Sequence, residues 1–455
     1  MSLSMDTSPD AGATVASAAA NQPDRTPVSP RPRRGLRTGP LRLRNFRLLI
    51  AGQMVSTIGD MFYAVALPWF VLSNGGTPRD LGIVLAAYGI PRAGFVLLGG
   101  ALSDRLQPRR IMLLADIARA LLVGGLAAIV LLDMHTLWIL CAIAAPLGAF
   151  EGLFLPASMA ILPSIMSDDD LQAGNAINMA TVQISTLAGP SVGGIIVASV
   201  RSGIAFAIDA GTFVVSAIAL AAMRGKRAPK ESVVVTGAEL AETPAAETAE
   251  TQEASAADAD EPKTFWALLR QSRLLQTGLA VSIVANLAFG GLIEVALPDL
   301  AHGPLHAGAT GFGLMLSTFG VGALAGTLIG ATMGKLPRRG MIALIFALVQ
   351  GVLVAITPFT GGLTGAAITM AGWGLFNSVS NVLIITLLQQ KLPRSLMGRI
   401  MGAFGFANFG LYPISVAVGG VVVDRLGPEI LFVITGVLLF VAILYGLFQP
   451  ELRNM

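Results

Sequence analysis

Several ionisable side chains lie inside long apolar stretches of this chain, where their chemistry is limited to exchanging protons or binding charged groups. Asp60, Arg92 and Glu151 are each flanked by mainly apolar residues. At a rise of 1.5 Å per residue, each lies roughly 15–18 Å from a predicted helix end, near the middle of a ~30 Å hydrocarbon core. Because an ionisable group at that depth is costly, these three are the leading candidates for coupling or binding.

Asp60 and Arg92 fall on consecutive predicted helices at similar depth, which makes them candidates for a buried ion pair. Movement of a ligand or a helix that separated the pair would leave Asp60 free to take a proton. Two alternatives remain open. The pair could simply hold the two helices together, or Arg92 could extend its long side chain toward anionic lipid.

Glu151 is the best single candidate for a coupling or substrate-binding acid. It lies in the segment Gly148-Ala149-Phe150-Glu151-Gly152. An unpaired acid at this depth is suited to exchanging a proton near neutral pH, or to binding a cationic ligand. The alternative is a protonated, hydrogen-bonded carboxyl group in a wall.

Four other charged residues receive lesser roles. Glu294 lies near the outer end of its predicted helix, so we expect it at the mouth of a cavity or in a gate. Asp116 and Arg119 are three residues apart and share one helix face, which indicates structural or gate support. Asp209 is expected to pair or cap locally.

Twelve long apolar segments position these groups. The chain has 455 residues, of which 54% are hydrophobic and 13% charged, whereas roughly 25% are charged in soluble domains. A spanning helix needs ~20 mainly apolar residues, and the short alternating segments of a transmembrane β-barrel are not visible. We predict an all-α polytopic membrane protein. The predicted spans are about 48–74, 80–102, 109–132, 136–162, 171–200, 202–223, 274–299, 308–334, 340–358, 361–389, 396–423 and 428–448.

The net charge of +3 indicates membrane topology rather than nucleic-acid binding. Most Lys and Arg residues fall on one predicted side of the membrane, and Arg79, Arg201 and Arg425 fall on the other. The positive-inside rule therefore predicts that both termini and the central segment are cytoplasmic in a multi-pass protein of the cell membrane. Anionic headgroups of membrane lipids would then face the basic side.

The chain divides into two related halves. We expect a disordered cytoplasmic arm without a signal peptide and an acidic linker too polar to bury apolar surface. The predicted units are residues 1–41 (arm), 42–224 (first six-helix bundle), 225–272 (linker), 273–450 (second bundle) and 451–455 (tail). Val65-Ala66-Leu67-Pro68 recurs as Val295-Ala296-Leu297-Pro298. Repeated halves are typical of secondary transporters with a substrate site between them.

The loop between the second and third spans carries the most specific motif, Gly100-Ala101-Leu102-Ser103-Asp104-Arg105 followed by Arg109-Arg110. It resembles the loop between helices 2 and 3 of major facilitator superfamily transporters. The resemblance covers about residues 42–450 and implies twelve helices in two pseudo-symmetric bundles, with a cavity lined mainly by helices 1, 4, 7 and 10. It also implies a cytoplasmic gate in which Asp104 contacts the facing half, with Gly100, Arg105 and Arg109 around it.

The fifth predicted helix contains Gly189-Pro190-Ser191-Val192-Gly193-Gly194. This resembles the GPxxGG signature of superfamily antiporters that export drugs. Pro190 would kink the helix, and Gly193 and Gly194 would permit close packing. A plain helix–helix contact is the alternative. The whole pattern resembles the twelve-helix branch of drug, macrolide and siderophore exporters.

Amide and aromatic side chains lie on the helices that the resemblance assigns to the cavity. The candidates are Asn286, Asn377, Asn381 and Trp373. Amides and aromatics around few charges suit an amphipathic ligand. Asn377 and Asn381 are four residues apart on one helix face, and a hydrogen bond between helices is an equally good interpretation of their role.

Enzyme chemistry is not indicated. The chain has no phosphate-binding loop, no His or Cys cluster with metal spacing and no nucleophile motif, so no cofactor or metal is expected. We expect a monomeric, proton-coupled efflux transporter of small amphipathic molecules such as drugs, antibiotics or secreted metabolites. The alternatives are a dedicated siderophore or lipid-like exporter or flippase, and a transporter-like receptor that moves nothing.

Overall fold

The computed structural model describes residues 39–224, 269–270, 273–333, 338–391, 400, 407 and 410–447. Within these ranges every regular element is a helix, so the predicted all-α class is confirmed. Ten helical stretches in the same ranges are long and apolar enough to cross a membrane. The protein is therefore an integral membrane protein. Nearly all of the predicted arm and linker, and the whole predicted tail, lie outside the described residues.

The first half consists of six helices whose bounds differ from the predicted spans by a few residues. Proline occupies the first position of both α2 and α3, where its missing N–H has no helical partner to lose. A capping box also starts α2, because the Asp80 N–H donates to the Thr77 hydroxyl and the Thr77 N–H donates to the Asp80 carboxylate. The helices are α1 (Arg44–Ser73), α2 (Pro78–Arg105), α3 (Pro108–Leu131), α4 (Leu137–Ile165), α5 (Asp168–Ser199) and α6 (Ser202–Ala222).

The second half repeats this pattern with one irregular span. That span runs through α8 (Arg273–Gly291), a π-helical segment (Leu292–Ala296) and α9 (Leu297–His302). Pro298 lacks the N–H that would bond to the carbonyl of Glu294 in a regular α-helix, so the irregular backbone lies where the sequence weakens the helix. The other helices are α10 (Gly308–Thr332), α11 (Arg339–Ile356), α12 (Leu363–Lys391), α14 (Tyr412–Leu426) and α15 (Pro428–Leu447).

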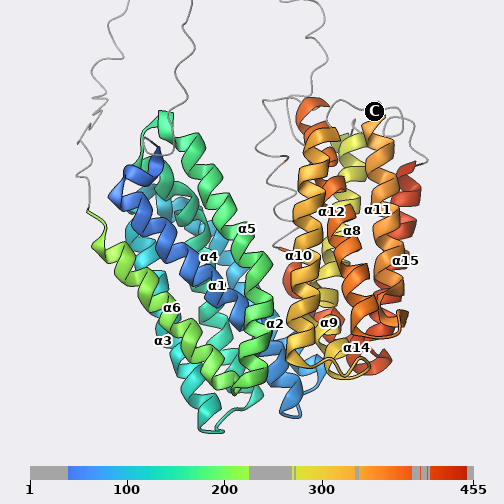
Figure 1. Ribbon diagram of the computed structural model, residues 1–455, viewed down its shortest axis with the longest axis horizontal. Coiled ribbons are helices and arrows are strands. Elements are labelled where there is room, and N and C mark those ends of the chain that lie inside the picture. Colours follow the sequence, from blue (N-terminus) through green and yellow to red (C-terminus); the bar gives the residue numbers. More distant parts are fainter. Residues whose placement is uncertain are drawn as a thin grey trace, which may run out of the picture.

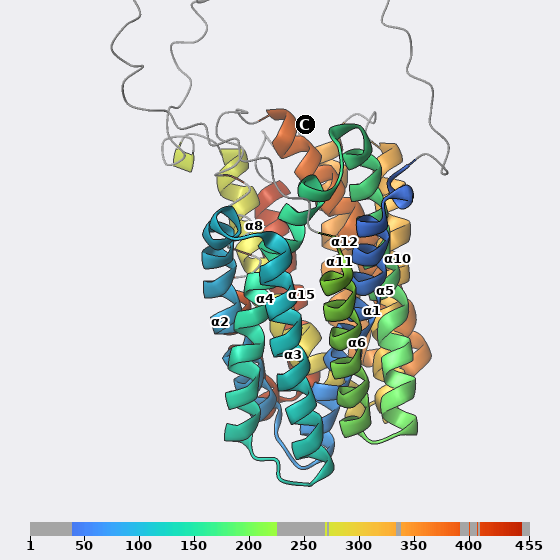
Figure 2. The same ribbon diagram turned by 90° about the vertical axis from the view of Figure 1, so that its left-hand side faces the viewer.

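The two halves form two bundles that lie side by side (Figure 1). We call the end at which α1 begins and α6 ends the linker end, and the opposite end the loop end. The bundles meet at the loop end and diverge toward the linker end (Figure 1). A view turned by 90° looks onto the first bundle with the second behind it (Figure 2). The predicted two-bundle architecture is confirmed.

Small residues allow the halves to meet at the loop end. A β-carbon on Gly194 of α5 would lie 2.6 Å from the carbonyl oxygen of Ala309, at the start of α10. A β-carbon on Gly420 of α14 would lie 2.8 Å from the carbonyl oxygen of Pro78 on α2. Both distances are too short for any side chain. Glycine at these positions is therefore a condition for the observed contact between the bundles.

We predict that Gly194→Leu and Gly420→Leu each move the bundles apart at the loop end, because the added side chain has no space. The measurement is the distance between spin labels on Met134→Cys and Phe359→Cys, in a Cys141→Ala background, by double electron–electron resonance. The two labelled residues belong to different halves, and their side chains are 63% and 64% exposed.

Gly125→Leu is the matched control, since a β-carbon there would meet nothing within 4 Å. We expect longer distances for the two interface variants and an unchanged distance for the control. Unchanged distances in all three variants would contradict the role of these glycines.

Candidate functional site

The acid Glu151 on α4 is held by two side chains of α2. The Nη2 atom of Arg92 lies 3.0 Å from Oε1 of Glu151, and the hydroxyl of Tyr88 donates to Oε2 of Glu151. The guanidinium of Arg92 also lies 5.8 Å from the centre of the Tyr88 ring. About a quarter of each charged side chain is exposed, 24% for Arg92 and 26% for Glu151. The pair is therefore half-buried and remains accessible.

Two glycines of α4 create this arrangement. A β-carbon on Gly148 would overlap the carbonyl oxygen of Tyr88, and one on Gly152 would lie 2.5 Å from the carbonyl oxygen of Arg92. The backbones of α2 and α4 therefore touch on both sides of Glu151. Small residues four apart commonly permit such close helix packing in membranes. The backbone of α2 at Tyr88 and Arg92 therefore lies directly beside α4, the helix that carries Glu151.

A second ion cluster lies inside the first half, where α1, α3 and α6 pack together. Arg119 contacts Asp116 at 2.7 Å and Asp60 at 3.7 Å. Its guanidinium lies 4.6 Å and 4.2 Å from the ring centres of Phe154 and Phe213, so it also makes cation–π contacts. The side chains of Arg119 and Asp116 are buried, whereas that of Asp60 is 35% exposed. Asp60 is therefore the accessible member of the cluster.

Asp209 on α6 adds a third carboxyl group to this region. It is buried, and the Thr212 hydroxyl donates to it at 3.4 Å, which agrees with the predicted local pairing. A β-carbon on Gly59 would lie 2.5 Å from its Oδ1 atom, so Asp209 packs directly against α1 next to Asp60. Within the described ranges, one oxygen of Asp209 and one of Asp116 have no hydrogen-bond partner. Three carboxyl groups thus lie in this region, and Arg119 contacts two of them.

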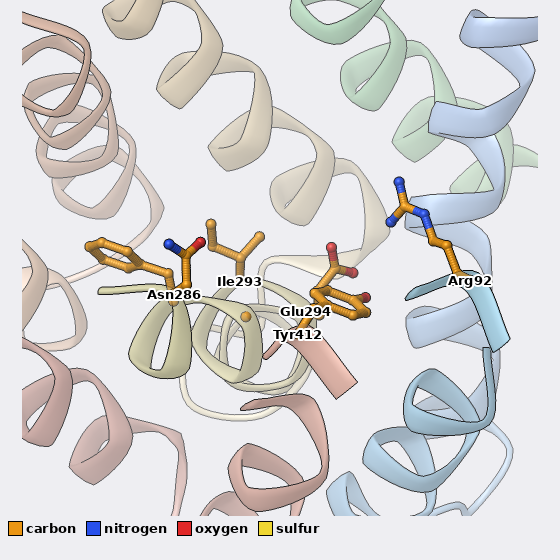
Figure 3. A pocket seen from close by; sticks show the side chains of 7 residues that line it. Arg92, Asn286, Ile293, Glu294 and Tyr412 are labelled. Atoms are coloured by element: carbon orange, nitrogen blue, oxygen red, sulfur yellow. The ribbon is translucent and has the colours of Figure 1, made fainter. Parts of the chain in front are cut away.

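A cavity of about 230 Å³ lies where the two halves face each other. Arg92 of α2 borders it on one side, and Glu294 and Tyr412 of the second half border it on the other (Figure 3). Asn286 and Phe289 of α8 complete the polar and aromatic lining. Arg92 therefore belongs both to the ion pair with Glu151 and to this cavity. The cavity and the ion pair form one continuous site.

The structure corrects one predicted pairing and places two other acids. Arg92 pairs with Glu151 rather than with Asp60, and Asp60 instead contacts Arg119. Glu151 therefore has partners, which agrees with the alternative of a hydrogen-bonded carboxyl group rather than with an unpaired acid. Glu294 lines the cavity between the halves, and its expected role at a cavity mouth or in a gate stays a prediction.

The aromatic candidate Trp373 also lies elsewhere than expected. Its side chain is only 1% exposed and packs between Phe289 and Phe319, with ring centres 5.1 Å and 5.0 Å apart. Trp373 therefore supports the wall of the cavity from behind, through Phe289. Asn286 does line the cavity, and its amide donates to the carbonyl oxygen of Ser282 at 2.8 Å. Asn381 donates to Asn377 along one face of α12 at 3.3 Å.

The predicted gate falls largely outside the described side chains. Gly100, Asp104 and Arg105 lie in the last turns of α2, and their surroundings are not among those described, so the gate stays a prediction. Arg109 donates to the carbonyl oxygens of Leu220 and Ala221 at 2.7 Å and 2.8 Å. It thus binds the end of α6 in its own half, where a basic side chain satisfies terminal carbonyl groups.

The motif of α5 forms contacts both within and between the halves. β-Carbons on Gly189 and Gly193 would meet Met61 and Phe62 of α1 at 2.5 Å and 3.2 Å. The carbonyl of Pro190 lies against Gly313 of α10, and the Ser191 N–H donates to the Ser317 hydroxyl at 3.0 Å. Together with Gly194, the motif therefore packs helices and lies outside the cavity lining.

Sequence reasoning missed Tyr88 and Tyr412. Tyr88 precedes Arg92 by four residues, so the two share a helix face, and this spacing was a signal that Tyr88 belongs to the site. Tyr412 lies three residues before Ser415 and reaches α2, where a β-carbon on Gly89 would meet its ring at 2.9 Å. No local pattern indicates that contact, because it depends on how the two halves pack.

Comparisons with known proteins agree on one family. The family model described as Major Facilitator Superfamily matches residues 49–415. A multidrug efflux pump, Tap of Mycolicibacterium fortuitum, is 26% identical over 428 residues, which cover 92% of this chain and 97% of Tap. The enterobactin exporter EntS of Salmonella choleraesuis (strain SC-B67) is 25% identical over 373 residues, covering 80% of this chain and 82% of EntS.

Solved structures show the same fold at low identity. A bacterial homologue of the iron transporter ferroportin in its inward-facing state aligns with a TM-score of 0.64 and 13% identity, over 89% of this chain and 99% of that chain. A D-xylose-proton symporter aligns with a TM-score of 0.64 and 15% identity, over 90% and 98% of the two chains. The relatives and structural neighbours named here are transporters rather than enzymes.

We predict that Arg119→Met lowers the free energy of unfolding by about 3–5 kcal/mol, because it leaves buried carboxylates without their guanidinium. The measurement is thermal or denaturant unfolding of the purified protein in detergent. Adding Asp116→Asn to this variant should recover part of the loss, since one uncompensated acid is removed. Arg201→Met, at an exposed position, is the control and should change stability by no more than about 0.5 kcal/mol. Wild-type stability of Arg119→Met would show that Arg119 does not hold the cluster together.

Proposed function

This chain belongs to the Major Facilitator Superfamily, and from that premise we propose that it exports small amphipathic molecules in exchange for protons. Glu151 would be the leading proton-binding acid. The cavity between the halves would be the place where substrate binds. The two halves would alternate between contact at the loop end and contact at the linker end.

The observation that carries the proposal is the position of the Arg92–Glu151 pair. The pair lies in the middle of α2 and α4 and adjoins the cavity that both halves line. A carboxyl group there can respond both to protons and to a ligand in the cavity. Ionisable groups inside transmembrane helices commonly mark such pathways.

Orientation follows from the distribution of basic residues. Lys and Arg are concentrated before α1 and in the turns at the linker end, which supports a cytoplasmic linker end. Contact between the bundles at the loop end would then correspond to an inward-facing state. In this state substrate would enter the cavity from the cytoplasm, as export requires.

The relatives support export rather than uptake, since one is named a multidrug efflux pump and the other an enterobactin exporter. A dedicated siderophore exporter is the second candidate function, and EntS is the observation that favours it. The two candidate functions differ in how many kinds of substrate the protein would transport. A lipid-like substrate is a further alternative. A receptor that moves nothing is an outcome that the experiment below separates from the exporters.

We predict that purified protein in proteoliposomes moves protons when substrate is added, and that Glu151→Gln abolishes this movement. An entrapped pH-sensitive dye would follow the protons, with ethidium, erythromycin and enterobactin as candidate substrates. Glu429→Gln, the same substitution at the start of α15 outside the site, is the control and should behave as wild type. A response to several compounds supports a multidrug exporter, and a response to enterobactin alone supports the dedicated exporter.

Substrate movement without proton movement would contradict the coupling. Unchanged proton flux in Glu151→Gln would remove Glu151 from its assigned role. Binding of a candidate substrate without its transport would favour the receptor.

A further inference from the structure

The cavity between the halves brings together an acid and an arginine from opposite halves. We propose that Glu294 binds the cationic group of a substrate and that Arg92 is a built-in competitor for Glu294, released when Glu151 takes a proton. The inference rests on the proposed transport function and adds to it the charge of the preferred substrate and the residue that links substrate to proton.

Glu294 has the surroundings of a cation site. It lies in the π-helical segment of the seventh span, an irregularity that is frequent at functional sites. In the described part of the chain it makes no hydrogen bond and no ion pair, and it lines the cavity beside Phe289 and Tyr412. Aromatic faces next to a carboxylate favour a lipophilic cation.

The position of Glu294 is fixed by α14. The Ser415 hydroxyl donates to the carbonyl oxygen of Leu287 at 2.6 Å and accepts from the N–H of Gly291 at 2.8 Å. These two backbone groups would bond directly to each other in an unbroken α-helix. Ser415 therefore bridges the helix immediately before the π-helical segment. The irregular backbone that carries Glu294 is thus supported by a side chain rather than left open.

The size of the cavity indicates which part of a ligand it holds. Its volume of about 230 Å³ is smaller than the roughly 300–1,000 Å³ of pockets that enclose drug-sized ligands. It therefore fits the charged end of an amphipathic molecule. The apolar remainder would extend out of this cavity between the two halves.

Arg92 interacts with one acid and faces the other. It is bonded to Glu151 at 3.0 Å, yet it borders the same cavity as Glu294 and acts on it electrostatically. Figure 3 shows the two side chains on opposite sides of that cavity. While Glu151 is ionised, it neutralises Arg92 and Glu294 is left for the substrate cation.

Protonation of Glu151 changes which acid Arg92 binds. One proton adds to a carboxylate oxygen of Glu151, the attraction between Glu151 and Arg92 is weakened, and Arg92 turns toward Glu294. The cation then loses its counter-charge and leaves. One proton enters for each monovalent cation that leaves, so the exchange moves no net charge. Proton and cation exclude each other because a proton on Glu151 releases Arg92, which then occupies the carboxylate of Glu294 where the cation would bind.

The other groups that face these residues do not replace Arg92. Asp60 and Tyr63 on α1, Arg119 on α3 and Tyr412 on α14 are the titratable neighbours that act on Arg92, Glu151 or Tyr412. Among them only Arg119 is cationic, and it is buried against Asp116 and Asp60. Arg92 is therefore the cation in the described part of the site that can exchange partners.

Binding of tetraphenylphosphonium, a permanent lipophilic cation, to the full-length protein in detergent tests this inference. Triphenylphosphine oxide is a neutral probe of similar shape and also reports that each variant is folded. We expect Glu294→Gln to weaken binding of the cation roughly tenfold or more and to leave the neutral probe unaffected. Glu429→Gln is the matched control and should bind both probes as wild type does.

A double-mutant cycle tests the competition itself. Glu151→Gln imitates the protonated acid and should weaken cation binding roughly tenfold. Arg92→Gln should restore binding in the Glu151→Gln background by more than it changes binding in wild type, since Arg92 competes only when Glu151 is neutral.

Each contrary result is decisive. If Arg92→Gln changes cation affinity equally in both backgrounds, Arg92 and Glu151 act on the cation independently, and the proposed competition is overturned. Unchanged cation affinity in Glu294→Gln would overturn the cation site. Wild-type protein that binds only the neutral probe would also overturn it. In both cases the proposed transport of amphipathic molecules would stand. Wild-type protein that binds neither probe would count against both the site and the proposed function.

Discussion

Charge balance inside the membrane is the constraint on which this structure depends. The central stretches of the described helices contain more acids than bases. They hold five carboxyl groups and two guanidinium groups, namely Asp60, Asp116, Glu151, Asp209 and Glu294 against Arg92 and Arg119. An uncompensated charge in a low-dielectric interior is strongly unfavourable. The two arginines cannot neutralise all five acids, and under the proposed function protons and cationic ligands supply the remainder.

The two arginines meet this constraint in different ways. Arg119 is enclosed by acids and by the rings of Phe154 and Phe213, which suits a permanent role in holding the first bundle together. Arg92 is partly exposed and borders the cavity between the halves, which suits a role that changes with the state of the protein. Burial thus separates a structural ion cluster from one that can respond to a ligand.

The sequence predicted the fold well, because helix length and hydrophobicity are local properties. Predicted spans such as 109–132 differ from α3 by a single residue at each end. The individual acids and bases were also found, since an ionisable residue in an apolar stretch is conspicuous. Their partners could not be found in the same way. Arg92 pairs across to α4 because Gly148 and Gly152 bring that helix against α2, and contact between helices does not follow their order in the chain.

Glu294 shows even more clearly that contacts between helices could not be predicted from the sequence. Its distance along the seventh span suggested a peripheral position, but the depth of a residue says nothing about which face of the helix it occupies. The π-helical segment and the contact of α14 through Ser415 determine that face, and both arise from packing between distant segments. Trp373 was misplaced for a similar reason, because an aromatic residue on a cavity-lining helix can equally face the helix behind it.

The number of protons released when a cation binds tests the exchange of protons for substrate most directly. It is obtained by titrating the protein with tetraphenylphosphonium calorimetrically in buffers of different ionisation enthalpy. In the pH range where wild-type affinity changes, we predict release of about one proton per bound cation, and almost none in Glu151→Gln. Binding of the cation to wild-type protein without proton release at any pH would contradict the account.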